Sequence, residues 1–185
     1  MSNKLKKFFK HLKKRDFFRG AAILFWKIEN GKKYVLLSER SCGYGKGYFS
    51  NQGGHQDSVD FENNKWLYLN TAVREAAEET KIVHQYGKYA SLSDKQKALQ
   101  KAKAFFLENP DFKFKTKPIR NFNIVVYQHV TYECQATGKM ADEKWYAESH
   151  ESTKGTMAWY ALDNLPKKIL FACRLNILYI RIFCK

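Results

Sequence analysis

The spacing of hydrophobic positions changes several times along this chain, and each change predicts a new element. Residues 19–40 contain two β-prone runs on either side of Asn30-Gly31. Both residues of this dipeptide tolerate a positive φ angle, so the pattern predicts a β-hairpin. Further strands are predicted over three segments: residues 82–90, residues 120–136 (as one long strand or a strand pair) and residues 157–162.

Helical spacing separates these strands. Helices are predicted over residues 66–79, residues 93–109 and Pro166–Phe183. Ser93 and Gln96 match a capping box at the start of the second helix. The third is apolar on most sides, which predicts burial within the chain or at a homodimer interface. Because strands and helices alternate irregularly, the pattern predicts an α/β fold with a mixed sheet flanked by helices.

The first residues form a different pattern. Leu5, Phe8, Phe9 and Leu12 recur at helical spacing, and lysines fill the other positions. This predicts a basic amphipathic helix over residues 1–18 that docks on the domain, or that contacts nucleic acid phosphates or a membrane surface. We therefore divide the chain into this helix and one domain, residues 19–185.

Composition narrows the class of protein and of partner. The chain has 185 residues, of which 44% are hydrophobic and 16% aromatic, so it is large enough for a core and is not a disordered chain. Lys and Arg number 33 against 18 Asp and Glu, for a formal net charge of +15. This excess favours polyanionic partners, namely nucleic acid (RNA among them), phosphorylated small molecules or an anionic membrane surface.

Other features indicate the compartment. The four cysteines are far apart, in a pattern that suits neither a zinc site nor a dense disulfide framework. The basic N-terminus lacks the continuous apolar segment of a secretory signal. The most apolar stretch, residues 169–183, is interrupted by Arg174, Asn176 and Arg181, so no transmembrane segment is predicted. We expect a cytoplasmic protein with reduced thiols.

The segment Thr71–Ile82 contains the most informative cluster of charge. Glu75, Glu78 and Glu79 are spaced i, i+3 and i+4, so a helix places them on one face, where like charges repel unless water or a cation intervenes. Mg²⁺ prefers such oxygen ligands together with substrate phosphates. The preceding loop, residues 41–57, holds five of the ten glycines, which indicates unusual backbone angles or close backbone approach. The pattern predicts either a divalent cation site beside this loop or a solvated helix face.

The order of these residues resembles the Nudix box, GX5EX7REUXEEXGU, where U is a bulky aliphatic residue. Here Gly54 is followed by five residues, Asp60, thirteen residues and then Arg74-Glu75-Ala76-Ala77-Glu78-Glu79. The early hairpin and the segment from residue 157 also resemble that family, so the resemblance implies a Nudix-like α/β/α sandwich. The chain departs from the pattern in four ways: Asp60 replaces a glutamate, residues 61–66 are an insertion, Lys81 replaces a glycine, and Asn51-Gln52 stands where many relatives have proline.

The resemblance also implies a chemistry. Nudix hydrolases cleave a diphosphate linkage in nucleoside diphosphate derivatives, such as a nucleotide sugar, a dinucleoside polyphosphate, a modified nucleoside triphosphate or a capped or triphosphorylated RNA end. Carried onto this chain, Glu75, Glu78, Glu79 and the Gly54 carbonyl would hold Mg²⁺ or Mn²⁺. Arg74 would orient a glutamate, reaching Glu78 at i+4. The general base would be Glu79 or a glutamate on the loop before the last strand, for which we choose Glu151.

Substrate contacts and rival functions complete the prediction. Arg40 is expected to meet a phosphate, Phe49 or Trp159 to stack on a base, and His55 to line the pocket, with core packing as the alternative role of each aromatic residue. A second reading is a Nudix-fold module that binds RNA or a nucleotide without turnover. The segment around His55 also has a slight similarity to isopentenyl-diphosphate isomerases, but no cysteine lies beside His55.

Overall fold

A seven-stranded mixed sheet carries the fold in the computed structural model, which describes residues 18–43, 45–63, 65–80, 91–124, 127–142, 153 and 156–184. Its strands are β1 (Phe18–Glu29), β2 (Lys32–Glu39), β3 (Phe49–Ser50), β4 (Gln52–His55), β7 (Phe112–Ile124), β8 (Tyr127–Ala136) and β9 (Ala158–Ala161). The order is β3-β2-β1-β8-β7, with β4 also beside β1 and β9 beside β2. The β1–β8 pair is parallel and the other pairs are antiparallel.

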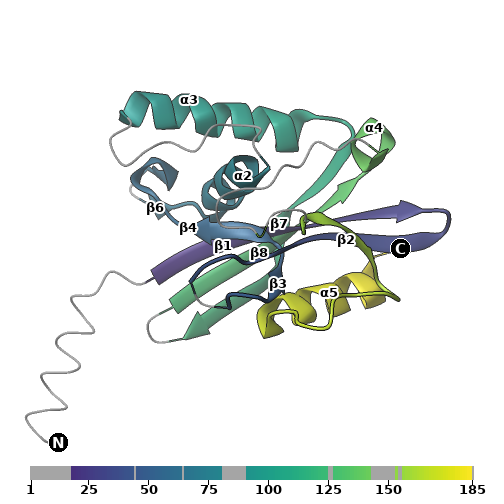
Figure 1. Ribbon diagram of the computed structural model, residues 1–185. Helices are drawn as coiled ribbons and strands as arrows, with labels where there is room; N and C mark the ends of the chain where they lie inside the picture. Colours follow the sequence, from purple (N-terminus) through teal and green to yellow (C-terminus); the bar gives the residue numbers. More distant parts are fainter. Residues whose placement is uncertain are drawn as a thin grey trace, which may run out of the picture.

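Helices cover both faces of this sheet (Figure 1). On one face lie α2 (Tyr68–Glu79) and α3 (Leu92–Lys103), which continues into a π-helical segment, η2 (Ala104–Glu108). On the other face lies α5 (Phe171–Phe183), and a short helix α4 (Gly138–Asp142) follows β8. This arrangement confirms the predicted α/β/α sandwich. Among the described residues, no helix is long and apolar enough to span a membrane.

The central strand β1 shows why two helical layers form. Its alternate residues Ile23 and Phe25 join the core under α2 and α3, whereas Leu24 and Trp26 join the core under α5. Since successive side chains of a strand point to opposite faces, a strand that is apolar at every position must be covered on both sides. The predicted hairpin is confirmed at its end, where Asn30 and Gly31 have φ angles of 50° and 73°.

The helix α2 lies close to the sheet because its inner face is made of small side chains. Ala72, Val73, Ala76 and Ala77 are fully buried against β1 and β4. This packing fixes the rotation of the helix about its axis. The charged residues of the Arg74–Glu79 segment are thereby directed at β4 and at the turn that precedes the helix.

The insertion at residues 61–66 forms a small hairpin of its own, β5 (Phe61–Glu62) and β6 (Lys65–Trp66). The Phe61 and Trp66 rings pack edge to face, with centroids 4.9 Å apart. At its base the Leu67 N–H donates to the Asp60 carbonyl at 3.1 Å. The two halves of the box therefore remain adjacent despite the extra residues.

Three details differ from the prediction. The N-cap of α3 is Ser91, whose hydroxyl accepts from the Asp94 N–H at 3.1 Å, so the capping box predicted at Ser93 is wrong. The strand pair is confirmed, but β7 begins at residue 112 and tolerates Pro118 because its register shifts between Lys115 and Arg120. The last helix begins at Phe171 and buries only one face. The predicted helix over residues 1–18 and strand over residues 82–90 lie outside the described residues, except for Phe18.

Candidate functional site

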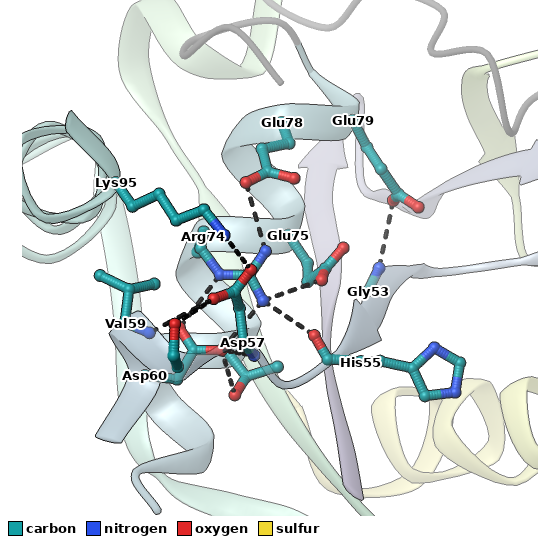
Figure 2. Close-up of polar contacts among 12 residues, drawn as sticks. Gly53, His55, Asp57, Val59, Asp60, Arg74, Glu75, Glu78, Glu79 and Lys95 are labelled. Atoms are coloured by element: carbon teal, nitrogen blue, oxygen red, sulfur yellow. Dashed lines mark hydrogen bonds and ion pairs between the residues drawn. The ribbon is translucent and has the colours of Figure 1, made fainter. Parts of the chain in front are cut away.

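An arginine on α2 organises the carboxylates of the box (Figure 2). Arg74 Nε donates to Asp60 Oδ1 at 3.0 Å, and Arg74 Nη2 donates to Asp60 Oδ2 at 2.9 Å. The two side chains are 7% and 0% exposed. Two parallel charge-assisted hydrogen bonds in a buried position fix the plane of the guanidinium as well as its location.

Both carboxylate oxygens of Asp60 accept hydrogen bonds within the protein. Besides Arg74, its Oδ2 accepts from the Thr71 hydroxyl at 3.0 Å and from the Asp57 N–H at 2.9 Å. Asp60 ends a 3-10 turn, η1 (Ser58–Asp60), for which Asp57 is the N-cap. A fully buried carboxylate with this many donors is an anchor for Arg74 and is not available to a metal ion.

The remaining donors of Arg74 reach the helix's own glutamates. Nη1 donates to Glu78 Oε1 at 3.2 Å, which confirms the predicted i, i+4 contact, and Nη2 lies 2.9 Å from Glu75 Oε1. Nη2 also donates to the His55 carbonyl at 2.8 Å, which ties β4 to α2. Burial opposes the charged form, but the bonds to Asp60 and the charge of Glu75 raise the pKa of Arg74 above its ordinary value.

A lysine from α3 supports the same turn. Lys95 Nζ lies 2.6 Å from Asp57 Oδ2. Burial would raise the pKa of Asp57, but the hydrogen bonds from Lys95 and Ser58 outweigh it and lower this pKa to about 2. The turn that presents Asp60 is therefore held by α2 and α3 together.

The glycine pair of β4 brings the backbone up to the remaining carboxylates. The Gly53 N–H donates to Glu79 Oε2 at 3.1 Å. A Cβ atom on Gly54 would lie 2.3 Å from Glu75 Oε2, so only glycine leaves room for that carboxylate. Close approach explains these two glycines, whereas Gly43, Gly45 and Gly47 of the same loop have positive φ angles.

The two glycines give a matched pair of substitutions. A Cβ on Gly53 would lie 2.5 Å from the Ala21 carbonyl and 2.3 Å from Ala22 Cβ, which are fixed in the sheet. We expect Gly53→Ala to lower the free energy of unfolding by about 1–3 kcal/mol, because the strands must separate. Gly54→Ala meets only a movable side-chain end, so it should lower stability less but displace Glu75 and weaken binding of a divalent cation. Urea unfolding and Mn²⁺ titration of both variants check this contrast, and equal stability losses would contradict it.

The charge of this site suits a divalent cation. The carboxylates of Asp60, Glu75, Glu78 and Glu79 exceed the Arg74 guanidinium by three negative charges when all four are ionised, in a chain whose formal net charge is +15. Burial raises the pKa of Glu78 even though Arg74 lowers it, so its charge is incompletely compensated. Carboxylate oxygens are the ligands that Mg²⁺ prefers, so the chemistry of the donor set fits.

The carboxylates are nevertheless not gathered around one point. Over the residues that the structure describes, no three His, Cys, Asp or Glu side chains form a group that could hold a metal ion. Glu75 and Glu78 are turned to Arg74, and Glu79 is turned to the Gly53 N–H (Figure 2). A cation held by all three would have to draw these side chains from their present partners.

The residues predicted to contact substrate are spread over both faces of the sheet. Trp159 packs in the core on the α2 face, with Lys27 Nζ 5.4 Å from its ring centroid. Phe49 packs against Tyr160 on the α5 face, with centroids 5.4 Å apart, so the sheet separates it from the glutamates. It is partly buried against the core on that face, which is the alternative role expected for it, and its stacking on a base stays a prediction.

His55 and Arg40 contribute differently from the prediction. His55 offers its carbonyl to Arg74, while its imidazole points away from the carboxylates (Figure 2). Arg40 closes the glycine-rich loop through its backbone: its N–H donates to the Tyr48 carbonyl at 3.0 Å, and its carbonyl accepts from the Gly47 N–H at 2.9 Å. Glu151 lies outside the described residues.

A second histidine, His129, lies partly buried close to His55. His55 on β4 and His129 on β8 both pair with Gly20 of β1. Burial, with the charges of Arg120 and His55, lowers the pKa of His129 to about 4.

This shift predicts a loss of stability in acid. The unfolded chain binds a proton to residue 129 near pH 6.5, whereas the folded chain resists protonation until about pH 4. The free energy of unfolding should therefore fall between these pH values, by at most about 1.4 kcal/mol per pH unit from this residue. Urea unfolding of wild type and His129→Gln between pH 7 and 4 measures the difference. Identical slopes in the two proteins would contradict the assignment.

The main functional residue without an assigned role in the sequence analysis is Asp60. Its position, separated from Gly54 by five residues, was the available signal, because the resemblance places an acidic residue there. Its pairing with Arg74 across fourteen residues is visible only when the insertion folds back on itself. Asp57 and Lys95 carry no motif signal at all.

Comparisons with known proteins bear on the fold. No family model matches the chain, and no curated protein matches its sequence. Among solved structures, it is similar to the Nudix hydrolase RenU from M. smegmatis, at 15% identity and a TM-score of 0.56 over 89% of this chain and 83% of that chain. It is also similar to the Ap4A hydrolase of C. elegans, at 14% identity and a TM-score of 0.52, over 88% of this chain and 94% of that chain. The Nudix domain of Shewanella oneidensis NrtR, complexed with ADP ribose, matches at 17% identity and a TM-score of 0.50 over 98% and 97%.

Proposed function

We propose that this chain, which has the fold of the Nudix hydrolases, is a metal-dependent hydrolase that cleaves a diphosphate linkage in a nucleoside diphosphate derivative. The observation that carries the proposal is the carboxylate cluster of α2, held by Arg74 against the Gly53-Gly54 segment. Glu75, Glu78 and Glu79 share one helix face at i, i+3 and i+4, where like charges repel one another, and a bound cation would offset that cost.

The proposed roles combine the resemblance with the observed contacts. Glu75, Glu78 and Glu79, with the Gly54 carbonyl, would hold Mg²⁺ or Mn²⁺. When bound, the cation neutralises charge on the phosphates and activates a water molecule for attack on phosphorus. Arg74, fixed by Asp60, limits the positions that Glu75 and Glu78 can take. Glu79 is the described candidate for the general base that accepts the water's proton, and Glu151 remains a candidate from the sequence.

Charge and similarity together indicate the substrate class. The net charge of +15 attracts anions, and it attracts highly charged polyphosphates most strongly. Two of the similar structures are those of an Ap4A hydrolase and of a domain bound to ADP ribose. Ap4A and ADP ribose are both nucleotides that contain a phosphate anhydride. We therefore propose that the substrate has a phosphate anhydride attached to at least one nucleoside. Of the two aromatic residues predicted to stack on a base, Trp159 is the one on the side of the glutamates.

A turnover screen tests the proposal. Full-length protein with Mg²⁺ is incubated with nucleotide sugars, dinucleoside polyphosphates, oxidised nucleoside triphosphates and 5′-triphosphate RNA, and products are separated by anion exchange. We expect at least one compound to release a nucleoside monophosphate or inorganic phosphate product, and EDTA to stop the reaction. Absence of product from every compound would count against hydrolysis.

One observation favours the second candidate, a module that binds a nucleotide or RNA without turnover. Glu75 and Glu78 are paired with Arg74 instead of being grouped for a metal. Calorimetric titration with Mn²⁺ separates the two functions. Metal binding together with turnover supports the hydrolase, whereas nucleotide binding without metal binding supports the module.

A further inference from the structure

The last helix, α5, is apolar on two opposite sides. Its inner side packs on the sheet through Cys173, Ile177 and Ile180. Its outer side exposes five large hydrophobic residues: Phe171 (75%), Leu175 (40%), Leu178 (47%), Ile182 (57%) and Phe183 (66%). The spacing of the first four, i, i+4, i+7 and i+11, aligns them as a continuous stripe. We call these five residues the outer stripe.

The exposed hydrophobic residues of the described chain are concentrated in the outer stripe. Nine large hydrophobic residues are exposed in the described parts of the chain, and five of them belong to this helix. Single exposed apolar residues are normal on a protein surface, but a contiguous patch usually marks a contact surface. Packing within the described chain accounts for the apolar residues on the inner side of α5 only. The outer stripe is therefore a candidate surface for contact with a partner.

The charges on α5 and on the segment just before it are all of one sign. Arg174 and Arg181 lie on the helix, Lys167 and Lys168 precede it, and no Asp or Glu occurs between residues 164 and 185. The two arginines are exposed and donate to backbone carbonyls, Arg174 to Ile169 and Lys167, and Arg181 to Leu162. Among the described residues, none of these four cations forms an ion pair with a carboxylate.

A groove extends this surface at the start of α5. It is open, has a volume of about 600 Å³, and is lined by Gly45, Lys46, Tyr48, Ile169, Leu170, Phe171 and Arg174. The loop that carries Lys46 is packed against the helix start, where a Cβ on Gly45 would lie 2.6 Å from Leu170 Cδ2. Two cations, Lys46 and Arg174, and the exposed ring of Tyr48 therefore lie beside Phe171, the first residue of the outer stripe.

We propose that the outer stripe and this groove form a surface that docks on an anionic lipid bilayer. An apolar stripe bordered by Arg and Lys is the pattern of helices that lie in a membrane interface, where the apolar residues enter the acyl region and the cations meet lipid phosphates. A second copy of the chain is a poor occupant, because a two-fold contact would bring the same cations together in a molecule of net charge +15. The carboxylate helix α2 lies on the opposite face of the sheet, so the docked surface does not cover it (Figure 1).

Vesicle co-sedimentation of the full-length protein tests this surface. We expect binding to vesicles of phosphatidylcholine with phosphatidylglycerol, little binding to phosphatidylcholine alone, and weaker binding at high salt. The triple variant Leu175→Gln, Leu178→Gln, Ile182→Gln should lower the partition coefficient at least about tenfold. The double variant Lys167→Gln, Lys168→Gln should lower it about 30-fold, at about a factor of five per cation.

The controls keep the test specific. Leu92 is 53% exposed on α3, on the other face of the sheet, so Leu92→Gln should bind vesicles like wild type. Near-UV circular dichroism confirms that each variant is folded. The predicted N-terminal helix is left intact in all proteins, so equal vesicle binding by wild type and the triple variant would assign binding to another segment and overturn the proposal. The proposal would also be overturned if the wild-type protein did not bind anionic vesicles, or if it bound RNA but not vesicles. A wild-type dimer that the triple variant converts to a monomer would overturn it as well.

Discussion

Replacing Arg74 with methionine should lower the free energy of unfolding by about 3–5 kcal/mol, since it leaves a buried carboxylate without its partner. Asp60 is fully buried, and both of its oxygens accept hydrogen bonds from Arg74. The variant also removes the cation that lies between Glu75 and Glu78. Chemical denaturation at neutral pH measures the loss.

An exposed ion pair provides the matched control for this substitution. Lys32 and Asp163 are 3.2 Å apart, but their side chains are 62% and 63% exposed. Lys32→Met should therefore change the free energy of unfolding by less than about 1 kcal/mol. If Arg74→Met and Lys32→Met had equal effects, the box arginine would not be the structural centre of the site.

Replacing Glu78 or Glu79 with glutamine should lower kcat/KM by about a thousandfold, the range expected when a general base or a metal ligand is lost. Glutamine keeps the shape of the side chain and one acceptor oxygen, so Glu79→Gln can still accept from the Gly53 N–H. Both variants should remain folded. Turnover of whichever compound the Mg²⁺ screen identifies is the measurement.

An exposed glutamate supplies the comparison for these variants. Glu108 lies at the end of η2, away from α2 in sequence, and is exposed. Glu108→Gln should keep kcat/KM within about twofold of wild type, as expected for surface substitutions. Full activity in Glu78→Gln and Glu79→Gln would show that the glutamates are not the catalytic group.

The parts of the fold that depend on local sequence could be predicted. The hairpin follows from two residues with positive φ angles, and the carboxylate helix follows from the 3.6-residue spacing of its apolar positions. The contact between Arg74 and Glu78 is likewise local, because residues four apart are neighbours on any helix.

The parts that depend on tertiary packing could not be predicted. The side of the sheet on which Phe49 lies is set by β3, a strand of only two residues that shows no alternation. Ser91 and Ser93 both carry an N-cap signal, and the sequence does not decide between them. The exposed side of α5 is at least as apolar as its buried side, so composition alone predicts burial all round.

The proposed function depends on joint binding of a divalent cation by Glu75, Glu78 and Glu79 beside the Gly53-Gly54 segment. Manganese anomalous diffraction from a crystal soaked in Mn²⁺ tests it most directly. We predict an anomalous peak within about 2.3 Å of oxygens from these three glutamates, with Glu75 and Glu78 turned from Arg74 toward the ion. An empty anomalous map, with the glutamates still paired to Arg74 and to the Gly53 N–H, would contradict the proposed site.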